Sequence, residues 1–419
     1  MRPALSRLIE PIAPSRLGRS FRWLLSATVV ENVGDGIALA AGPLLVASQT
    51  RDPFLVSLAL LAQYVPTLLF GVIFGAAADR FNRKRMVVVV NLMRSVVVTG
   101  LVITIVTGNV NIAVVLIVLF ILGSAETLAD SASSTLLPGL VARADLGIAN
   151  ARMQGAFLLT NQLVAPPIGA FLFAAGMAVP FAANAVAFAL SALLISRVVA
   201  STTHELRERA GFRAEMAEGI RWLVAHPAMR TLAVTVFLFN VTYGAAWSVL
   251  VLYAGERLGM DEVGFGLITT SIAIGGIIGT FSYARLERRF SLGDLMRIGL
   301  LIETFTHLVL AITTSAAVAL GVFVLFGVHA FVWGTTATVI RQRAVPDELL
   351  GRVGGVTRVA VIGGLVIGTP IGGAIASGYG ITAPFWFGFI GSALLVVILW
   401  REFRHIAHAA DGPATIQST

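Results

Sequence analysis

Three carboxylates lie inside long apolar stretches of the sequence, where an ionised side chain is costly. Glu31 and Asp35 are four residues apart, which places them on one face of a helix, and Glu126 lies in a separate apolar stretch. A charge at the centre of a hydrocarbon layer costs roughly 3 kcal/mol or more, so such residues are candidates for binding ions, protons or substrate. A carboxylate that alternates between neutral and charged forms can couple a protein to a proton gradient. We expect at least one of the three, Asp35 first, to bind protons or substrate; the alternative is a structural hydrogen bond to a neighbouring helix.

Two further charges, Arg94 and Asp130, are expected at a shared depth in the membrane. Counted at ~1.5 Å per residue from the inner ends of their helices, Arg94 lies ~12 Å deep and Asp130 ~10 Å deep. The shared depth predicts a structural ion pair in which each charge offsets the burial cost of the other. Arg83 is a competing partner for Asp130.

Three other ionisable residues lie in later apolar stretches. Glu303 and His307 are four residues apart, in a stretch where a local pair or a lipid-facing groove explains them as well as a function does. His329 stands alone and is expected to be a structural histidine with satisfied hydrogen bonds. Two histidines in the tail, without acidic or cysteine neighbours, are a weak metal signal, so we predict no metal site.

Five aromatic side chains on two apolar stretches could form the wall of a cavity for a drug-like molecule. Aromatic walls with few polar groups suit amphipathic ligands. Ordinary packing or contact with lipid is the alternative for about half of them. The five residues are Phe237, Tyr243, Trp247, Phe326 and Trp333.

The composition is that of a protein dominated by membrane-spanning helices. Of its 419 residues, 57% are hydrophobic and 12% are charged, and the mean hydropathy is +0.88, which is more apolar than a soluble domain requires. The chain has no cysteine, which excludes disulfides and thiolate chemistry. Lys84 is its single lysine, and no Gly-Lys-Ser/Thr loop for ATP phosphates is present. We therefore predict no catalytic site, no cofactor and no ATPase activity.

Repeated apolar stretches have the length that a membrane requires. A bilayer core of ~30 Å needs about 20 apolar residues per helix. The predicted fold is an all-α membrane protein with twelve transmembrane helices in two six-helix bundles. The predicted spans are about 21–47, 54–78, 86–107, 110–137, 151–177, 181–200, 228–254, 262–284, 294–313, 316–340, 353–378 and 383–400.

The cations are concentrated in alternate loops between these spans. Arginines precede the first span, follow the second, fill the segment between the sixth and seventh, and occupy the later alternate loops. The loops at 107–111, 176–180, 313–316 and 378–383 carry no charge. This is the positive-inside pattern, and it predicts that both termini are cytoplasmic. The pI of 10.8 therefore reflects membrane topology and does not indicate a nucleic-acid partner.

The longest polar stretch divides the spans six and six. The predicted domains are a cytoplasmic segment at 1–20, a first bundle at 21–200, a linker with an amphipathic helix at 201–227, a second bundle at 228–400 and a cytoplasmic tail at 401–419. The bundles repeat weakly, because Pro167-Ile168-Gly169-Ala170 and Pro370-Ile371-Gly372-Gly373 each precede a Pro-Phe pair that opens the next span. Weak repeats of this kind are typical of transporters built from two related halves.

The most informative motif follows the second span. There, one acid and a dense run of cations separate two apolar helices, in the segment Gly75-Ala76-Ala77-Ala78-Asp79-Arg80-Phe81-Asn82-Arg83-Lys84-Arg85. It resembles the loop between helices 2 and 3 of the major facilitator superfamily, with Ala77 and Asn82 replacing the usual Leu and Gly. The resemblance implies the major facilitator fold, alternating access, and a latch at the inner face with Asp79 near the positive end of the eleventh helix. The expected latch residues are Gly75, Asp79, Arg80, Arg83 and Lys84.

Two further sets of residues resemble smaller groups of proteins within this superfamily. In span five, Pro166, Pro167 and Gly169 are similar to the glycine- and proline-containing pattern of antiporters in the superfamily. The segments Gly34-Asp35-Gly36 and Glu218-Gly219-Ile220-Arg221-Trp222 resemble the branch that includes macrolide and enterobactin exporters. That branch also contains lysophospholipid carriers, so the resemblance does not name a substrate.

These observations predict a monomeric, multi-pass transporter in the cytoplasmic (inner) membrane of a bacterium, in contact with the lipid bilayer. The resemblance implies proton antiport that exports a lipophilic, cationic, drug-like small molecule and so gives antibiotic resistance. Alternatives within transport are export of a defined metabolite such as a siderophore, or movement of a lysophospholipid. A membrane sensor or a membrane enzyme is the alternative from a different class, but no sensory domain or catalytic constellation supports either.

Overall fold

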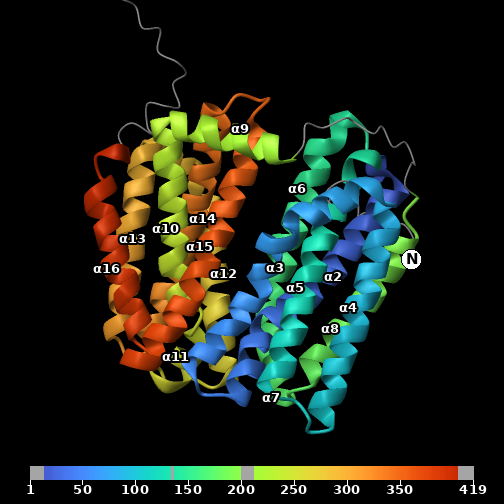
Figure 1. Ribbon diagram of the computed structural model, residues 1–419, viewed down its shortest axis with the longest axis horizontal. Coiled ribbons are helices and arrows are strands. Elements are labelled where there is room, and N and C mark those ends of the chain that lie inside the picture. Colours follow the sequence, from blue (N-terminus) through green and yellow to red (C-terminus); the bar gives the residue numbers. More distant parts are fainter. Residues whose placement is uncertain (1–13, 134–135, 200–211, 404–419) are drawn as a thin grey trace, which may run out of the picture. The chain divides into compact units, whose positions relative to one another are not determined.

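The computed structural model describes residues 14–133, 136–199 and 212–403 (Figure 1). Within these residues every regular element is a helix and none is a strand, which confirms the predicted all-α class. Most of the predicted N-terminal segment and tail, and the first part of the linker, lie outside the described residues.

Internal contacts divide the chain into two units. The first contains the described residues of Met1–Arg51, Ala62–Leu206 and Glu262–Thr270, and the second contains those of Asp52–Leu61, Arg207–Asp261 and Ser271–Thr419. The helices that begin at Pro53 and Glu262 therefore each contribute residues to both units.

The first unit is built mainly from the helices of the N-terminal half. They are α2 (Gly18–Gln49), α3 (Pro53–Arg80), α4 (Arg83–Val106), α5 (Ile112–Ser133), α6 (Leu146–Phe157), the π-helical segment η4 (Leu158–Val164), α7 (Ala165–Ala175) and α8 (Val179–Ser196), with short 3-10 turns at Ser15–Leu17, Leu137–Gly139 and Arg143–Asp145. Helix α2 is central to this unit, because it packs against α6, η4, α7 and α8.

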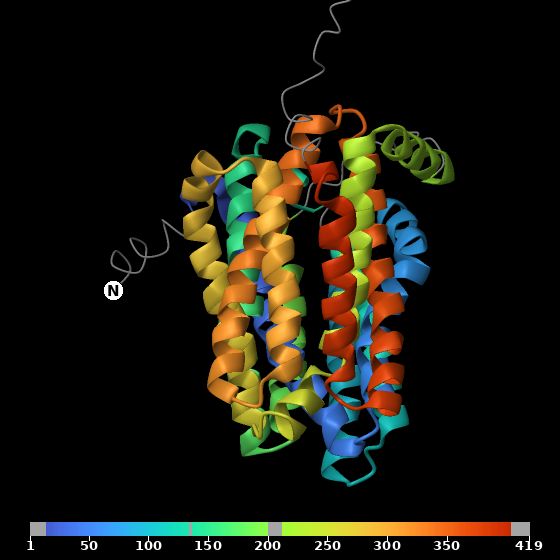
Figure 2. The same ribbon diagram turned by 90° about the vertical axis from the view of Figure 1, so that its left-hand side faces the viewer.

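The second unit is built mainly from the helices of the C-terminal half. They are α9 (Phe212–Ala225), α10 (Pro227–Trp247), α11 (Leu250–Glu256), α12 (Glu262–Arg289), α13 (Leu292–Ile312), α14 (Ala316–Ala344), α15 (Leu350–Tyr379) and α16 (Ala383–Leu399). Helix α10 packs along α15 and α16, and α13 packs between α14 and α16 (Figure 2). The amphipathic helix α9 meets α10 at a bend of 110°, so its axis crosses the direction of the apolar helices.

Ten helices in the described residues are long and apolar enough to cross a membrane. The bent pair of α9 and α10 gives an eleventh candidate, and α16 is a shorter apolar helix of 17 residues. The chain is thus a multi-pass membrane protein, while the count of twelve and the side on which the termini lie remain predictions.

A cap explains why the cationic motif departs from its usual sequence. Asn82 is the N-cap of α4, and its side-chain oxygen accepts a hydrogen bond from the backbone N–H of Arg85 at 3.0 Å. Ser291 has the same role for α13, where it accepts from the N–H of Asp294 at 3.1 Å. A side-chain acceptor at this position satisfies one of the free N–H groups of the first turn, which glycine cannot do.

Close backbone contacts bear out the internal repeat. A side chain at Gly169 on α7 would meet the backbone of Ile37 on α2, and a side chain at Gly372 on α15 would meet the backbone of Ala245 on α10. Each unit therefore joins its first long helix to its fifth through a glycine that allows backbone to touch backbone. Small residues serve this purpose between membrane helices, where packing replaces the hydrophobic effect as the driving force.

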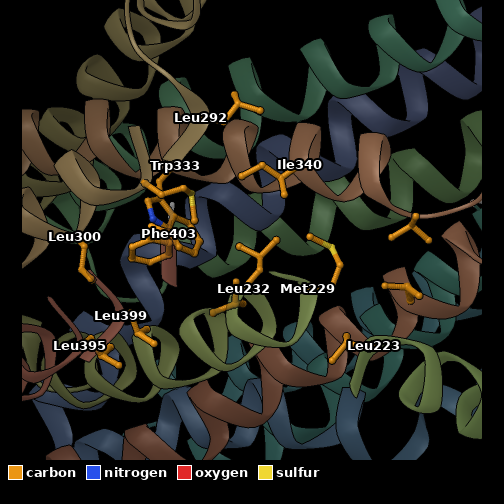
Figure 3. Close-up of a cluster of buried hydrophobic side chains, with 14 residues drawn as sticks. Leu223, Met229, Leu232, Leu292, Leu300, Trp333, Ile340, Leu395, Leu399 and Phe403 are labelled. Carbon is orange, nitrogen blue, oxygen red and sulfur yellow. The ribbon is translucent and has the colours of Figure 1, made fainter. Parts of the chain in front are cut away.

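A cluster of buried apolar side chains fills the space between the helices of the second unit (Figure 3). Leu232 and Met229 come from α10, Leu300 from α13, Trp333 from α14 and Leu395 from α16. The cluster fixes α10, α13, α14 and α16 against one another, and these helices carry the aromatic and ionisable residues described below.

Candidate functional site

A buried guanidinium organises the polar centre of the first unit. Arg94 on α4 has 2% of its side chain exposed. Its Nη1 donates to Glu31 Oε1 at 2.9 Å, and its Nη2 donates to Asp35 Oδ1 at 2.7 Å. The flat face of the guanidinium lies 3.9 Å from the ring centre of Phe188 on α8. Charge-assisted bonds and the aromatic face together accommodate a cation in the interior.

Glu31 receives two further hydrogen bonds from neighbouring helices. Asn91 Nδ2 on α4 and Ser191 Oγ on α8 both donate to Glu31 Oε2 at 3.2 Å. Asn91 and Arg94 are three residues apart, so they lie on the same face of α4 and both meet α2. Asp35 has Arg94 as its hydrogen-bond donor. The two carboxylates are therefore unequally supported, and Glu31 has the larger set of donors.

The charges of this centre do not balance. Two carboxylates share one guanidinium, and their side chains are 17% and 21% exposed. Glu126 and Asp130, both exposed on α5, add negative charge that acts on Asp35 and Arg94. Glu31 and Asp35 of the predicted acidic group therefore meet at Arg94, whereas the role of Glu126 stays a prediction.

The predicted ion pair between Arg94 and Asp130 is wrong. The hydrogen bonds of Arg94 go to Glu31 and Asp35, which are one turn apart on α2. Each of these carboxylates accepts from one of the two terminal nitrogens of the guanidinium. Depth along a helix can be counted from the sequence, but the direction in which a side chain points cannot. Asp130 has an exposed side chain on α5, whereas Arg94 points into the interior.

The antiporter-like residues of span five lie at a change of helix type. Pro166 and Pro167 have no N–H to continue an α-helix, and the preceding seven residues of η4 are π-helical. The N–H of Ala165 bonds the carbonyl of Thr160, five residues back. Gly169 follows within the same turn and touches α2 at Ile37. The motif therefore positions α7 against the helix that carries Glu31 and Asp35.

The predicted latch residues occupy the turn between α3 and α4. Gly75 lies in α3, which ends at Arg80, and Arg83 and Lys84 begin α4. The side chains of Asp79 and Arg80 lie outside the described part of the chain, so the latch remains a prediction.

Four of the five predicted cavity aromatics meet in one column of rings in the second unit. Tyr243 stacks on Trp247 with ring centres 4.4 Å apart, and Tyr243 stacks on Phe326 at 5.9 Å. Phe239 completes the column, because it stacks on Tyr243 at 6.1 Å and on Trp333 at 5.5 Å. Phe239, Tyr243 and Trp247 are half-buried, whereas Phe326 and Trp333 are buried.

Phe237 is replaced in this column by Phe239, which the sequence prediction missed. The ring of Phe237 instead lies near Gly363 on α15. The available signal was the spacing of four residues between Phe239, Tyr243 and Trp247, which places all three on one helix face.

The repeat shows that the charged centre and the aromatic column occupy equivalent positions. Asp35 precedes the backbone contact at Ile37 by two residues, as Tyr243 precedes the contact at Ala245. By the same count, Glu31 corresponds to Phe239. The same helix faces therefore carry acids in the first unit and aromatic rings in the second.

Glu303, expected in a local pair or a lipid-facing groove, is fully buried between two histidines. Glu303 Oε1 lies 3.3 Å from His307 Nδ1, and Glu303 Oε2 lies 3.4 Å from His329 Nε2. His329 is therefore not a lone structural residue, because α14 brings it to the carboxylate on α13. Neither oxygen of Glu303 has a hydrogen bond, so the expectation of satisfied hydrogen bonds at His329 is also wrong.

Long apolar helices in two repeated units, with a charged centre in one and a ring column in the other, are typical of a membrane transporter. The chain belongs to the transmembrane secretion effector family of the major facilitator superfamily (MFS_3), which matches residues 9–412.

Two curated relatives extend over most of the chain. The multidrug efflux pump Tap of Mycolicibacterium fortuitum is 28% identical over 377 residues, which are 86% of this chain and 90% of the relative. The enterobactin exporter EntS of Shigella boydii serotype 4 (strain Sb227) is 24% identical over 403 residues, which are 92% of this chain and 93% of the relative.

Solved structures of transporters share the fold. A bacterial homologue of the iron transporter ferroportin in an inward-facing state has a TM-score of 0.71 at 19% identity, and the match covers 93% of this chain and 98% of that chain. The nucleoside transporter NupG has a TM-score of 0.70 at 11% identity, and the match covers 93% and 99% of the two chains. These similarities establish the major facilitator fold.

Proposed function

We propose that this transporter exports lipophilic, cationic small molecules across the bacterial cytoplasmic (inner) membrane in exchange for protons. The observation that carries the proposal is the imbalance of charge at Arg94, where Glu31 and Asp35 share one guanidinium. One added positive charge makes this centre neutral. A proton can supply that charge, and so can a cationic substrate nearby, so the two compete for the same centre. Competition of this kind is what antiport requires.

Asp35 is the proposed proton acceptor. Glu31 is supported as an anion by Arg94, Asn91 and Ser191, whereas the donor of Asp35 is Arg94. Hydrogen bonds to the charged form of a carboxylate favour that form, so the proton goes to the carboxylate with fewer donors. Glu126, exposed on α5, adds negative charge that favours a cationic ligand over an anionic one.

The aromatic column of Phe239, Tyr243 and Trp247 is, within the second unit, a proposed binding surface for aromatic, cationic substrates. Stacked rings accept flat, polarisable ligands, and aromatic faces attract cations. The efflux pump among the relatives supports a drug-like substrate, which would make the transporter a source of antibiotic resistance. We further propose that it acts as a monomer, with Asp79 and the neighbouring cations as the conformational latch.

Export of a defined metabolite such as a siderophore is the second candidate, supported by the enterobactin exporter among the relatives. An anionic siderophore requires a cation that is free to meet it. Arg94 is already bonded to two carboxylates, which favours the cationic substrate.

Efflux from energised vesicles tests the proposal. Vesicles containing the transporter are loaded with tetraphenylphosphonium or ethidium, and transport is followed with and without a protonophore. We expect uphill transport to collapse when the proton gradient is removed, and Asp35→Asn to lose proton-driven transport while remaining folded. Transport that needs ATP or sodium and ignores the proton gradient would refute antiport with protons.

A further inference from the structure

The second unit contains a buried cluster of three titratable residues that the proposed function does not use. Glu303, His307 and His329 have side chains that are at most 1% exposed. The two imidazoles lie on opposite sides of the carboxylate, at 3.3 Å and 3.4 Å from its two oxygens. Both oxygens of Glu303, Nε2 of His307 and both ring nitrogens of His329 lack hydrogen bonds.

The packing around the cluster leaves room for these side chains. On α13 and α16, Gly299 and Gly388 lie where a side chain would collide with His329 and His307 respectively. Three rings of the aromatic column lie against the two histidines. The ring centre of Trp247 is 6.2 Å from that of His307, edge-on, and the ring centres of Phe239 and Phe326 are 6.2 Å and 5.9 Å from that of His329.

No other charge within the described residues is placed to neutralise Glu303. Helix α16 contains no titratable residue, and α10 contributes Tyr243 in the neighbouring ring column. On α13 itself, Asp294 and Arg297 pair with each other at 3.3 Å, ~9 Å along the helix from Glu303.

The remaining charges of the neighbouring helices lie at helix ends. On α10, Arg230 is in the first turn, and on α14 the arginines Arg341 and Arg343 are in the last turn. Helix α12, which packs on α14, has its cations in its final turns, where Glu287 pairs with Arg343 at 2.8 Å. Among the residues that the structure describes, the two histidines are therefore the groups placed to offset a charge on Glu303.

The charges of these three side chains indicate how many protons the cluster binds. An ionised Glu303 between two neutral imidazoles would be a buried charge with neither a counter-charge nor a hydrogen bond, which is strongly unfavourable. One proton removes this cost, either on the carboxylate or on an imidazole. The proton can reside on any of the three side chains without a change in the net charge of the cluster.

We propose that Glu303, His307 and His329 form a proton-binding site that contains one exchangeable proton inside the second unit. The repeat supports this assignment, because Glu303 lies twelve residues after the cap Ser291, as Arg94 lies twelve residues after the cap Asn82. Each position is ~18 Å from the start of its helix, near the centre of a ~30 Å bilayer core. The third long helix of each unit thus places one ionisable residue at mid-membrane.

Histidine NMR tests the proposal directly, because the chain has six histidines. The full-length protein is labelled with 15N-histidine, purified, and titrated with pH, and the carboxylic-acid band is followed by infrared spectroscopy on the same samples. His307→Gln and His329→Gln assign the two rings. We expect one transition in which the proton leaves the cluster, visible at a ring nitrogen, in the carboxylic-acid band, or in both.

Glu303→Gln removes the acid while keeping its shape. We expect this variant to lose the transition and to keep both rings neutral throughout. Asp35→Asn, in the other unit, is the matched control and should leave the transition at the His307 and His329 ring nitrogens unchanged. If Glu303→Gln does not fold, His329→Gln replaces it and should shift the transition measured at His307. If the ring nitrogens of His307 and His329 do not change with pH and the carboxylic-acid band loses no component in Glu303→Gln, the proposal is overturned. Such a result would leave the carboxylic-acid component lost in Asp35→Asn, and proton-driven efflux through Asp35, unaffected.

Discussion

Removing the guanidinium at the centre of the first unit should be strongly destabilising. Arg94→Gln leaves Glu31 and Asp35 facing each other without their counter-charge. Breaking a buried ion pair from one side costs about 3–5 kcal/mol, and loss of the cation above Phe188 adds roughly 1 kcal/mol. Both carboxylates are about one-fifth exposed, so the lower part of that range applies.

The expected loss of about 4 kcal/mol corresponds to a fall in melting temperature of roughly 8–16 °C, at 2–4 °C per kcal/mol for a unit of this size. The assay is thermal unfolding of purified protein in detergent, at a pH where carboxylates are ionised. Arg16→Gln is the matched control, because Arg16 pairs with Asp145 at 3.6 Å and is 58% exposed. A surface pair of this kind contributes about 0–1 kcal/mol.

A second variant tests whether charge is the cause. Asp35→Asn in the Arg94→Gln background removes one of the two unpaired acids, and Glu31 retains Asn91 and Ser191 as donors. We expect this double variant to recover a large part of the lost melting temperature. If Arg94→Gln melts like Arg16→Gln, or if the second substitution lowers the melting temperature further, the assignment of Arg94 as the counter-charge of α2 is refuted.

Three other outcomes are expected. Gly169→Leu should prevent folding or lower expression sharply, because its side chain would meet the backbone of α2, whereas a side chain at Gly147, in the first turn of α6, points into open space and Gly147→Leu should be tolerated; expression and gel-filtration profiles decide this, and equal behaviour would contradict the packing argument. Tyr243→Ala should weaken binding of ethidium by roughly tenfold, since a stacked aromatic contact contributes about 0.5–1.5 kcal/mol beyond its buried area, while Phe237→Ala should change it little; fluorescence titration separates the two. Asp79→Asn should slow turnover and leave ligand binding nearly unchanged, and a loss of binding with normal turnover would contradict the proposed latch.

The sequence was sufficient to predict the helical class, the repeat and the superfamily. Apolar length and the loop after α3 identified a transporter of the major facilitator superfamily, and the paired segments at Gly169 and Gly372 identified the repeat. Each of these features depends on short segments that can be recognised without knowing which helices pack together.

The partners of Arg94 could not be predicted from the sequence. Counting residues gave Arg94 and Asp130 the same depth, but helix rotation directs Arg94 toward α2 and leaves Asp130 exposed. Glu31 and Asp35 were recognised as functional candidates on one helix face, grouped with Glu126, but not as ligands of a shared guanidinium.

The cluster around Glu303 was missed for a related reason. Its pairing with His307 was visible at a spacing of four residues, whereas His329 comes from another helix and reaches the carboxylate only after α13 and α14 pack. Phe239 and Phe237 are two residues apart, and the four-residue spacing from Phe239 to Tyr243 and Trp247 favoured the one that joins the ring column. Side-chain direction in apolar helices with little polar patterning depends on packing.

The glycine contact at Ile37 also determines the mechanical stiffness of span five. Backbone touches backbone there, so no layer of side chains between α2 and α7 can repack to let one helix slide past the other. When α7 moves, α2 and its carboxylates Glu31 and Asp35 therefore move with it as one rigid body. The compliant part of this span is the π-helical segment immediately before Pro166, where the wider turn interrupts the α-helical hydrogen-bond ladder. Bending is thus concentrated at one end of a stiff pair of helices that carries the two acids.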